Sequence, residues 1–197
     1  MIESSALSRD RQDFVQEFIV RFTKQAGIIY QAESPDKVVS IVNGLIKSQS
    51  KGESCCANDL ELATNGSRTN ISPRIESTIS YDNFHKNPRQ VAGLIDVGVT
   101  RADGGIAETG SIIDVSYTDE HRLLSSLSRV HIAVLERSKI VGKLSMLSPM
   151  MKELLGRESQ KKRPSITFIG GPSRTSDIEL KSVLGVHGPH EVHVVLL

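Results

Sequence analysis

The sequence contains no tryptophan, and phenylalanine and tyrosine together make up only 4% of its residues. Proteins that bind single-stranded nucleic acid stack the bases on such rings, so this scarcity argues against a base-stacking surface. Positive and negative charges nearly balance, because the sequence has 24 Lys and Arg residues and 23 Asp and Glu residues. A chain this close to neutral has no overall field that would hold nucleic acid or an acidic membrane. We therefore expect neither partner.

Cysteine is almost as scarce, since the only two are the neighbours Cys55 and Cys56. Adjacent cysteines rarely form a disulfide with each other, and a structural zinc or an iron–sulfur cluster needs about four ligands. The pair is better explained as two small apolar side chains on or near a strand. We expect no metal and no cofactor of the chain's own.

Long apolar runs are also missing, as no stretch approaches the roughly 20 residues that cross a bilayer. The first four residues lack the basic and then apolar run of a signal peptide, so we expect a cytoplasmic protein. A length of 197 residues fits one domain. We assign residues 1–197 to a single domain, with residues 1–26 as an N-terminal helical extension.

The periodicity of the apolar residues alternates between strands and helices. A helix is expected over residues 10–26, where Phe14, Phe18 and Phe22 share a face, and another begins at Pro35 after a short strand at 28–30. Further helices are expected at 121–127, 139–155 and 176–184, and strands at 111–115, 130–135, 165–170 and 192–197. This βαβ rhythm predicts an α/β fold with a mostly parallel sheet and flanking helices. No element within residues 47–90 is assigned beyond short strands.

The first glycine-rich segment, residues 102–111, almost matches a phosphate-binding loop. That motif requires Lys directly after its last glycine and then a helix, whereas Ser111 and a strand follow here, so we reject ATP binding. The segment can still bring backbone amides close to a ligand. Its candidate ligand-binding residues are Gly104, Gly105, Glu108, Thr109, Gly110 and Ser111. The alternative is that the glycines serve only a tight turn.

The second segment, residues 169–179, leads from a strand through Gly170-Gly171-Pro172 to a run of polar residues. Ser176 and Glu179 have the spacing of a helix capping box, and ligands of α/β sheets bind beside such helix starts. Arg174 could hold a carboxylate or a phosphate through two parallel hydrogen bonds. The candidates here are Gly171, Ser173, Arg174, Thr175 and Asp177. The alternative is a capped helix with a solvated arginine.

Three histidines near the end of the chain, His187, His190 and His193, are spaced by three residues. Gly188-Pro189 breaks any helix, and the last two would point to opposite faces of a strand, so a metal site is disfavoured. His187 remains a candidate ligand-binding residue, with a turn-stabilising role as its alternative. His131, inside an apolar strand, is expected to be a core histidine.

Together these segments resemble the LUD domain family. The resemblance is carried by residues 102–111, by Gly171 to Glu179, by Gly185 to Pro189 and by the closing residues 193–197. It implies a three-layer α/β fold similar to the NagB/RpiA/CoA-transferase group. It also implies a role in oxidising lactate to pyruvate beside companions that carry FAD or iron–sulfur clusters.

Two functions stay open at this point. The chain could be an accessory or ligand-binding subunit of a lactate-utilisation system, without a redox centre and with a small carboxylate or phosphate as its ligand. It could instead be an independent enzyme of the CoA-transferase or cyclo-ligase type, with Glu108 as nucleophile or base. Homo-oligomers are possible in either case. We expect Glu108, Ser173, Arg174, Asp177 and His187 to converge on one surface.

Overall fold

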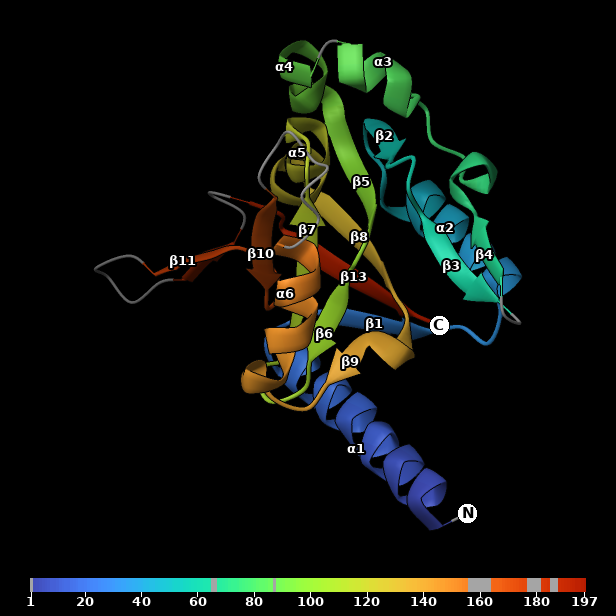
Figure 1. Cartoon of the computed structure of the whole chain (residues 1–197). Coiled ribbons are helices and arrows are strands. Elements are labelled where there is room, and N and C mark those ends of the chain that lie inside the picture. The colour runs from blue at the N-terminus through green and yellow to red at the C-terminus, as the bar shows by residue number, and fades with distance from the viewer. Residues whose placement is uncertain (1, 65–66, 87, 156–163, 177–181, 185–187) are drawn as a thin grey trace.

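A five-stranded parallel sheet forms the centre of the computed structural model, which describes residues 2–64, 67–86, 88–155, 164–176, 182–184 and 188–197. Figure 1 shows this sheet running through the middle of the molecule. The order across the sheet is β1 (Ile28–Gln31), β13 (Glu191–Leu196), β8 (Val130–Leu135), β5 (Ile95–Arg101) and β2 (Glu53–Cys56). Every neighbouring pair is parallel. The predicted α/β class is thus confirmed.

The two central strands form because both faces of the sheet are covered. All six residues of β8 are buried, as are five of the six in β13. Such continuous apolar runs are typical of parallel strands between two layers of helices. His131 is fully buried, and its ring lies 2.8 Å from the hydroxyl of Thr100, so it is a core histidine as predicted.

One face of the sheet is covered by α2 (Pro35–Gln49) and by the hairpin of β3 (Glu61–Thr64) and β4 (Ser67–Asn70). The Ser34 side chain caps α2 by accepting a hydrogen bond from the amide of Lys37 at 3.2 Å, with Pro35 in the first turn. This start agrees with the predicted one. The helix buries Val38, Val42 and other apolar residues against the sheet.

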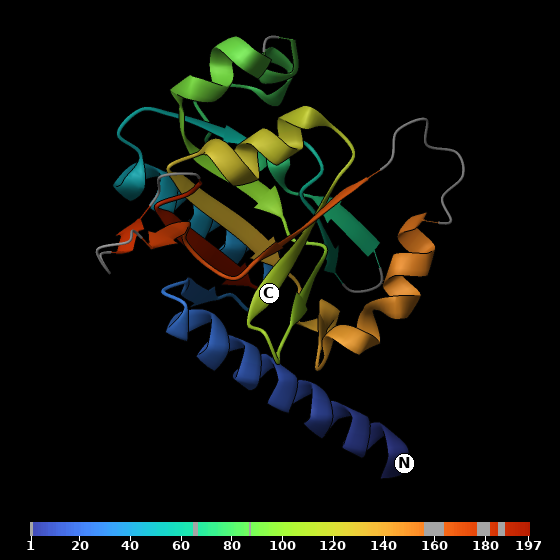
Figure 2. The same cartoon turned by 90° about the vertical axis from the view of Figure 1, so that its left-hand side faces the viewer.

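The other face carries α1 (Ile2–Lys24), which starts earlier than predicted and extends past the sheets at its N-terminal end (Figure 2). Phe18 and Phe22 are fully buried, with stacked rings 5.6 Å apart. They pack with Leu135 and Val194 of the central sheet. Burying each such ring contributes about 2–3 kcal/mol, so this helix is firmly attached through its C-terminal half.

A second, four-stranded sheet lies on the same side as α1. Its order is β10 (Ser165–Ile169), β7 (Ser111–Ser116), β6 (Gly104–Ile106) and β9 (Ile140–Val141). Strand β7 runs antiparallel to both of its neighbours. The prediction that 111–115 and 165–170 belong to the parallel sheet is therefore wrong. A turn of only four residues joins β6 to β7, and a connection that short makes an antiparallel hairpin.

We predicted a loop at Gly104 and Gly105. Both residues instead lie inside β6 and are buried. A side chain on Gly105 would come within 3.1–3.3 Å of Leu135, Ile140 and Phe18. The glycine therefore allows the second sheet to approach the core closely.

Two predicted helices need correction. Both ends of the expected helix over 176–184 lie in strands, because β11 (Arg174–Ser176) pairs with β12 (Ser182–Leu184), and the residues between them are outside the described ones. The expected helix over 139–155 is divided into η3 (Arg137–Lys139), β9, η4 (Leu144–Leu147) and α6 (Ser148–Leu155). The remaining elements are η1 (Ser72–Arg74), α3 (Tyr81–Lys86), α4 (Pro88–Val91), η2 (Ala92–Leu94) and α5 (Asp119–Leu127).

Cys55 and Cys56 are buried free thiols on β2, as the sequence predicted. Burial raises the pKa of the Cys55 thiol to about 12, so it stays protonated at physiological pH. Within the described ranges, no helix combines the length and the apolarity that crossing a bilayer requires.

Candidate functional site

The two glycine segments meet at Gln25, just after the end of α1. The side-chain amide of Gln25 donates to the carbonyl of Thr109 at 2.8 Å and to that of Gly110 at 3.1 Å. Its backbone carbonyl accepts a hydrogen bond from the guanidinium of Arg174 at 2.7 Å. A single residue thus connects the turn at 107–110 with the segment Gly170–Arg174, which we call the glycine–arginine loop.

Glycine is required at this junction by the close approach of the backbones. Gly110 has a φ of +60°, and a Cβ there would lie 2.6 Å from the backbone nitrogen of Phe22. Gly171 has a φ of +140°, and its Cβ would lie 2.6 Å from the carbonyl oxygen of Gln25. Both the conformation and the space therefore exclude a side chain.

Two hollows adjoin the glycine–arginine loop. The larger, about 420 Å³, lies between α5 and β10 and is bordered by Ser125, Thr167, Gly170, Gly171 and Ser173 among others. The smaller, about 300 Å³, is lined by Gln25, Gly170, Gly171, Pro172 and Arg174. Gly170 and Gly171 line both, so this backbone separates two spaces that are large enough for a small molecule.

Arg174 is exposed at the edge of the smaller hollow. Its one hydrogen bond within the described part of the chain goes to a neutral carbonyl, and no carboxylate there pairs with it. The guanidinium has five N–H donors, and this hydrogen bond leaves others that an anion can accept from.

The other predicted residues do not all lie near the glycine–arginine loop. Ser173 borders the larger hollow, and its amide donates to the carbonyl of Pro189 at 2.9 Å. The hydroxyl of Ser111 lies 3.6 Å from where a Cβ of Gly170 would be, so Ser111 also reaches this junction. Thr109 contributes its carbonyl, as described above. Glu108 turns away, because its carboxylate accepts a hydrogen bond from the amide of Leu144 at 2.8 Å.

Three predicted residues cannot be placed as side chains. Thr175 lies in β11, where its backbone pairs with Val183. Asp177 and His187 are outside the described residues. Of the five residues expected to converge, Ser173 borders the larger hollow, Arg174 borders the smaller one, and Glu108 points toward η4.

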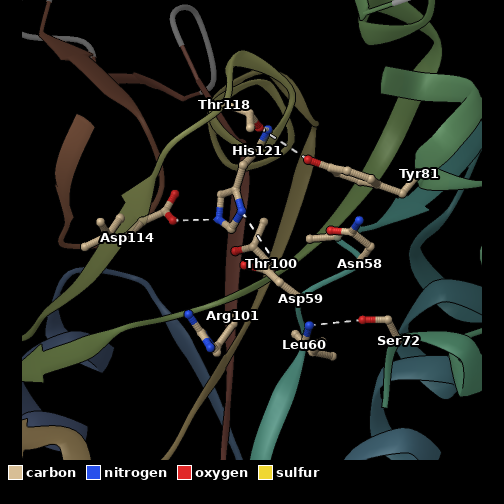
Figure 3. A network of polar contacts seen from close by, with 12 residues as sticks. Asn58, Asp59, Leu60, Ser72, Tyr81, Thr100, Arg101, Asp114, Thr118 and His121 are labelled. Atoms are coloured by element: carbon tan, nitrogen blue, oxygen red, sulfur yellow. Dashed lines mark hydrogen bonds and ion pairs between the residues drawn. The ribbon is translucent and has the colours of Figure 1, made fainter. Parts of the chain in front are cut away.

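A second polar site, which the sequence analysis missed, lies under the first turn of α5 (Figure 3). His121 of α5 places Nε2 at 2.9 Å from Oδ1 of Asp114 on β7. Its Nδ1 faces Oδ1 of Asp59, 3.9 Å away, in the segment after β2. The side chains of His121 and Asp114 are only 7% and 2% exposed, so this is a buried ion pair.

The protonation of this pair is set by its two members. Burial alone would raise the pKa of Asp114, but the hydrogen bond and the charge of His121 outweigh burial and lower it. Burial would also disfavour the charged form of His121 and so lower its pKa. Asp114, and then the charges of Asp59 and Asp103, outweigh burial and raise it. Both shifts favour a carboxylate facing an imidazolium.

Arg101, at the carboxyl end of β5, adds a cation beside this pair. Its Nη2 lies 3.0 Å from Oδ1 of Asp103, while its Nε has no hydrogen-bond partner in the described ranges. Burial raises the pKa of Asp103, although the charge of Arg101 opposes this. In open α/β sheets, ligands bind outside the carboxyl ends of the strands, and here Arg101 ends β5 while Asp59 follows β2.

One signal in the sequence could have revealed this site. Asp114 stands in the apolar strand Ile112-Ile113-Asp114-Val115, and a carboxylate in a buried strand requires a partner. The sequence does not say which of the six histidines supplies it. Among the described residues, no group of three or more His, Cys, Asp or Glu is arranged to hold a metal ion.

Comparisons with known proteins agree on one family. A model of the LUD domain matches residues 15–197. Lactate utilization protein C of Exiguobacterium sp. is 33% identical over 109 residues, which are 55% of this chain and 47% of that protein. The protein of the same name from Halalkalibacterium halodurans is 40% identical over 96 residues, which are 48% of this chain and 40% of that protein. The matched stretch thus spans less than half of each relative.

One solved structure is similar over nearly the whole chain. It is the crystal structure of a DUF162 family protein from Deinococcus radiodurans, with a TM-score of 0.59, 16% identity and coverage of 94% of this chain and 97% of that one. At such low identity the similarity supports the fold alone.

Proposed function

The chain belongs to the LUD domain family, and on that premise we propose that it binds a small anion as an accessory component of a lactate-utilisation system. The relatives' name, lactate utilization protein C, supports the metabolic assignment. In this proposal the chain carries no redox centre, and companions with FAD or iron–sulfur clusters perform the oxidation. The anion is a carboxylate or a phosphate.

The observation that carries the proposal is the position of Arg174 beside the glycine–arginine loop. Its guanidinium borders the smaller hollow and has no carboxylate partner among the described residues. A glycine backbone allows a ligand to approach closely, and an arginine can bind both oxygens of a carboxylate or phosphate. The positive side chain of Arg174 and the size of the smaller hollow together suit a small anion.

The hydrogen bond of Glu108 supports binding over the enzymatic alternative. A carboxylate that acts as nucleophile must reach the substrate, but that of Glu108 accepts from the amide of Leu144 and borders neither hollow described above. We therefore favour a ligand-binding role over a CoA-transferase or cyclo-ligase activity.

Isothermal titration calorimetry with L-lactate, pyruvate, propionate and inorganic phosphate tests the proposal. We expect at least one of these anions to bind, and Arg174→Ala to weaken its binding by about 1.5–3 kcal/mol, because a charge-assisted hydrogen bond is lost. Arg137→Ala is the matched control, since Arg137 bonds to Gln31 away from both hollows. Equal affinities of the two variants, or no binding of any probe, would contradict the proposal.

A further inference from the structure

The cluster under α5 contains buried polar atoms that the protein itself does not satisfy. Oδ1 of Asp59, Oδ2 of Asp114 and Nε of Arg101 are all buried and have no hydrogen-bond partner in the described part of the chain. Leaving such a group unsatisfied costs about 1–3 kcal/mol. We propose that Asp59, Asp114 and His121 form a site that recognises the hydroxyl group of a small ligand.

The spacing of two atoms indicates where the hydroxyl binds. Nδ1 of His121 and Oδ1 of Asp59 are 3.9 Å apart, too far for a direct hydrogen bond. An oxygen atom about 2.8 Å from each of them makes two hydrogen bonds of ordinary length. We place the hydroxyl oxygen of the ligand there, beside the line between the two atoms.

The chemistry of the two partners selects a hydroxyl for this position. Nε2 of His121 is engaged by Asp114, and the imidazolium favoured by that pair presents Nδ1–H as a donor. Asp59 offers only acceptor oxygens. The bridging group must accept from His121 and donate to Asp59, which a hydroxyl does. An ammonium group cannot accept, and a carboxylate cannot donate.

The surroundings restrict the rest of the ligand. Asp59, Asp103 and Asp114 together outnumber the cations Arg101 and His121. The site thus suits a small neutral alcohol better than an anion. Its open side is at Asp59, whose side chain is 47% exposed.

Nuclear magnetic resonance of the imidazole nitrogens of the full chain tests this site directly. The His121 signals are assigned by comparison with His121→Gln, and L-lactate, glycerol and propionate are the probes. The two hydroxylated probes should shift the His121 signals saturably. Propionate, which lacks the hydroxyl, should bind there at least about tenfold more weakly than L-lactate.

Asp59→Ala is the decisive variant, because Oδ1 of this half-exposed side chain has no hydrogen-bond partner in the described part of the chain, so its loss should not impair folding. It should weaken the glycerol response of His121 at least about tenfold, because the acceptor of the hydroxyl group is lost. Asp36→Ala, which removes an exposed carboxylate on α2, should leave that response unchanged. If no hydroxylated probe moves the His121 signals, if propionate moves them equally, or if Asp59→Ala has no effect, the site does not exist.

The outcome of this experiment at His121 does not depend on the anion binding proposed for Arg174. Arg174→Ala should weaken anion binding at the glycine–arginine loop without changing the His121 response to glycerol. Failure at one site therefore leaves the test of the other intact.

Discussion

The guanidinium of Arg174 donates a hydrogen bond of 2.7 Å to the backbone carbonyl of Gln25, a residue 149 positions earlier in the chain. The side chain of Gln25 at the same time holds the carbonyls of Thr109 and Gly110. Three distant segments thus depend on one residue at the end of α1. The arrangement of the glycine–arginine loop is for this reason coupled to the docking of that helix.

Gln25→Ala should therefore lower both stability and anion affinity. The substitution removes two hydrogen bonds to the 107–110 turn, so the free energy of unfolding in urea should fall by about 1–2 kcal/mol. Anion binding should weaken because Gln25 also lines the smaller hollow. Gln16→Ala, on the exposed face of the same helix, should change stability by less than about 0.5 kcal/mol. Similar losses in the two variants would show that Gln25 has no special role.

The fold was predictable where the local pattern and the tertiary structure agree. The strand at 130–135 and the helix start at Pro35 were predicted at the observed bounds, because buried parallel strands are continuously apolar and Ser-Pro marks a helix start. Which strands pair with one another was not predictable in the same way. Strand 111–115 was correctly found, but its antiparallel pairing depends on the turn at 107–110 and on β10.

The candidate site was predicted only in part for a similar reason. The glycines and Arg174 stand out in the sequence, whereas Gln25 is an ordinary polar residue just after α1, and its role arises from contacts far along the chain. The spacing of Ser176 and Glu179 matched a helix cap, but β11 pairs with β12 instead. Long-range pairing can override such a local signal.

The Asp114–His121 pair predicts a defined pH dependence of stability. The pKa of Asp114 is held below its usual 3.8, so its contribution is present above that pH and is lost as the pH falls through the lowered value. The pKa of His121 is held above 6.5, so its contribution is complete below that pH and is lost as the pH rises through the raised value. The pair should therefore stabilise the fold most between these two limits.

Urea denaturation of the wild type and of Asp114→Asn at pH 5 and pH 9 measures this effect. The difference in the free energy of unfolding between the two proteins should be larger at pH 5, where both charges are present. Asp82→Asn, at an exposed position on α3, should show no such change with pH. A difference that is constant or grows toward pH 9 would mean that His121 is not charged in the folded protein.

Two glycines should respond oppositely to the same substitution. Gly44 lies on an exposed part of α2, with nothing within 4 Å of the position a Cβ would take. Gly44→Ala should stabilise the protein by about 0.5–1 kcal/mol, because alanine restricts the unfolded chain and suits a helix. Gly110 has a φ of +60°, and its Cβ would lie 2.6 Å from the backbone of Phe22. Gly110→Ala should therefore destabilise the protein by more than about 1 kcal/mol.

The midpoints of urea unfolding for the two variants and the wild type give the comparison. Gly44→Ala also serves as the control for the general effect of replacing glycine by alanine. The 107–110 turn lies directly against the last turn of α1, so Gly110→Ala should also weaken anion binding at the neighbouring glycine–arginine loop. If Gly110→Ala is as stable as the wild type, α1 does not pack against that turn in solution, and the junction at Gln25 loses its basis.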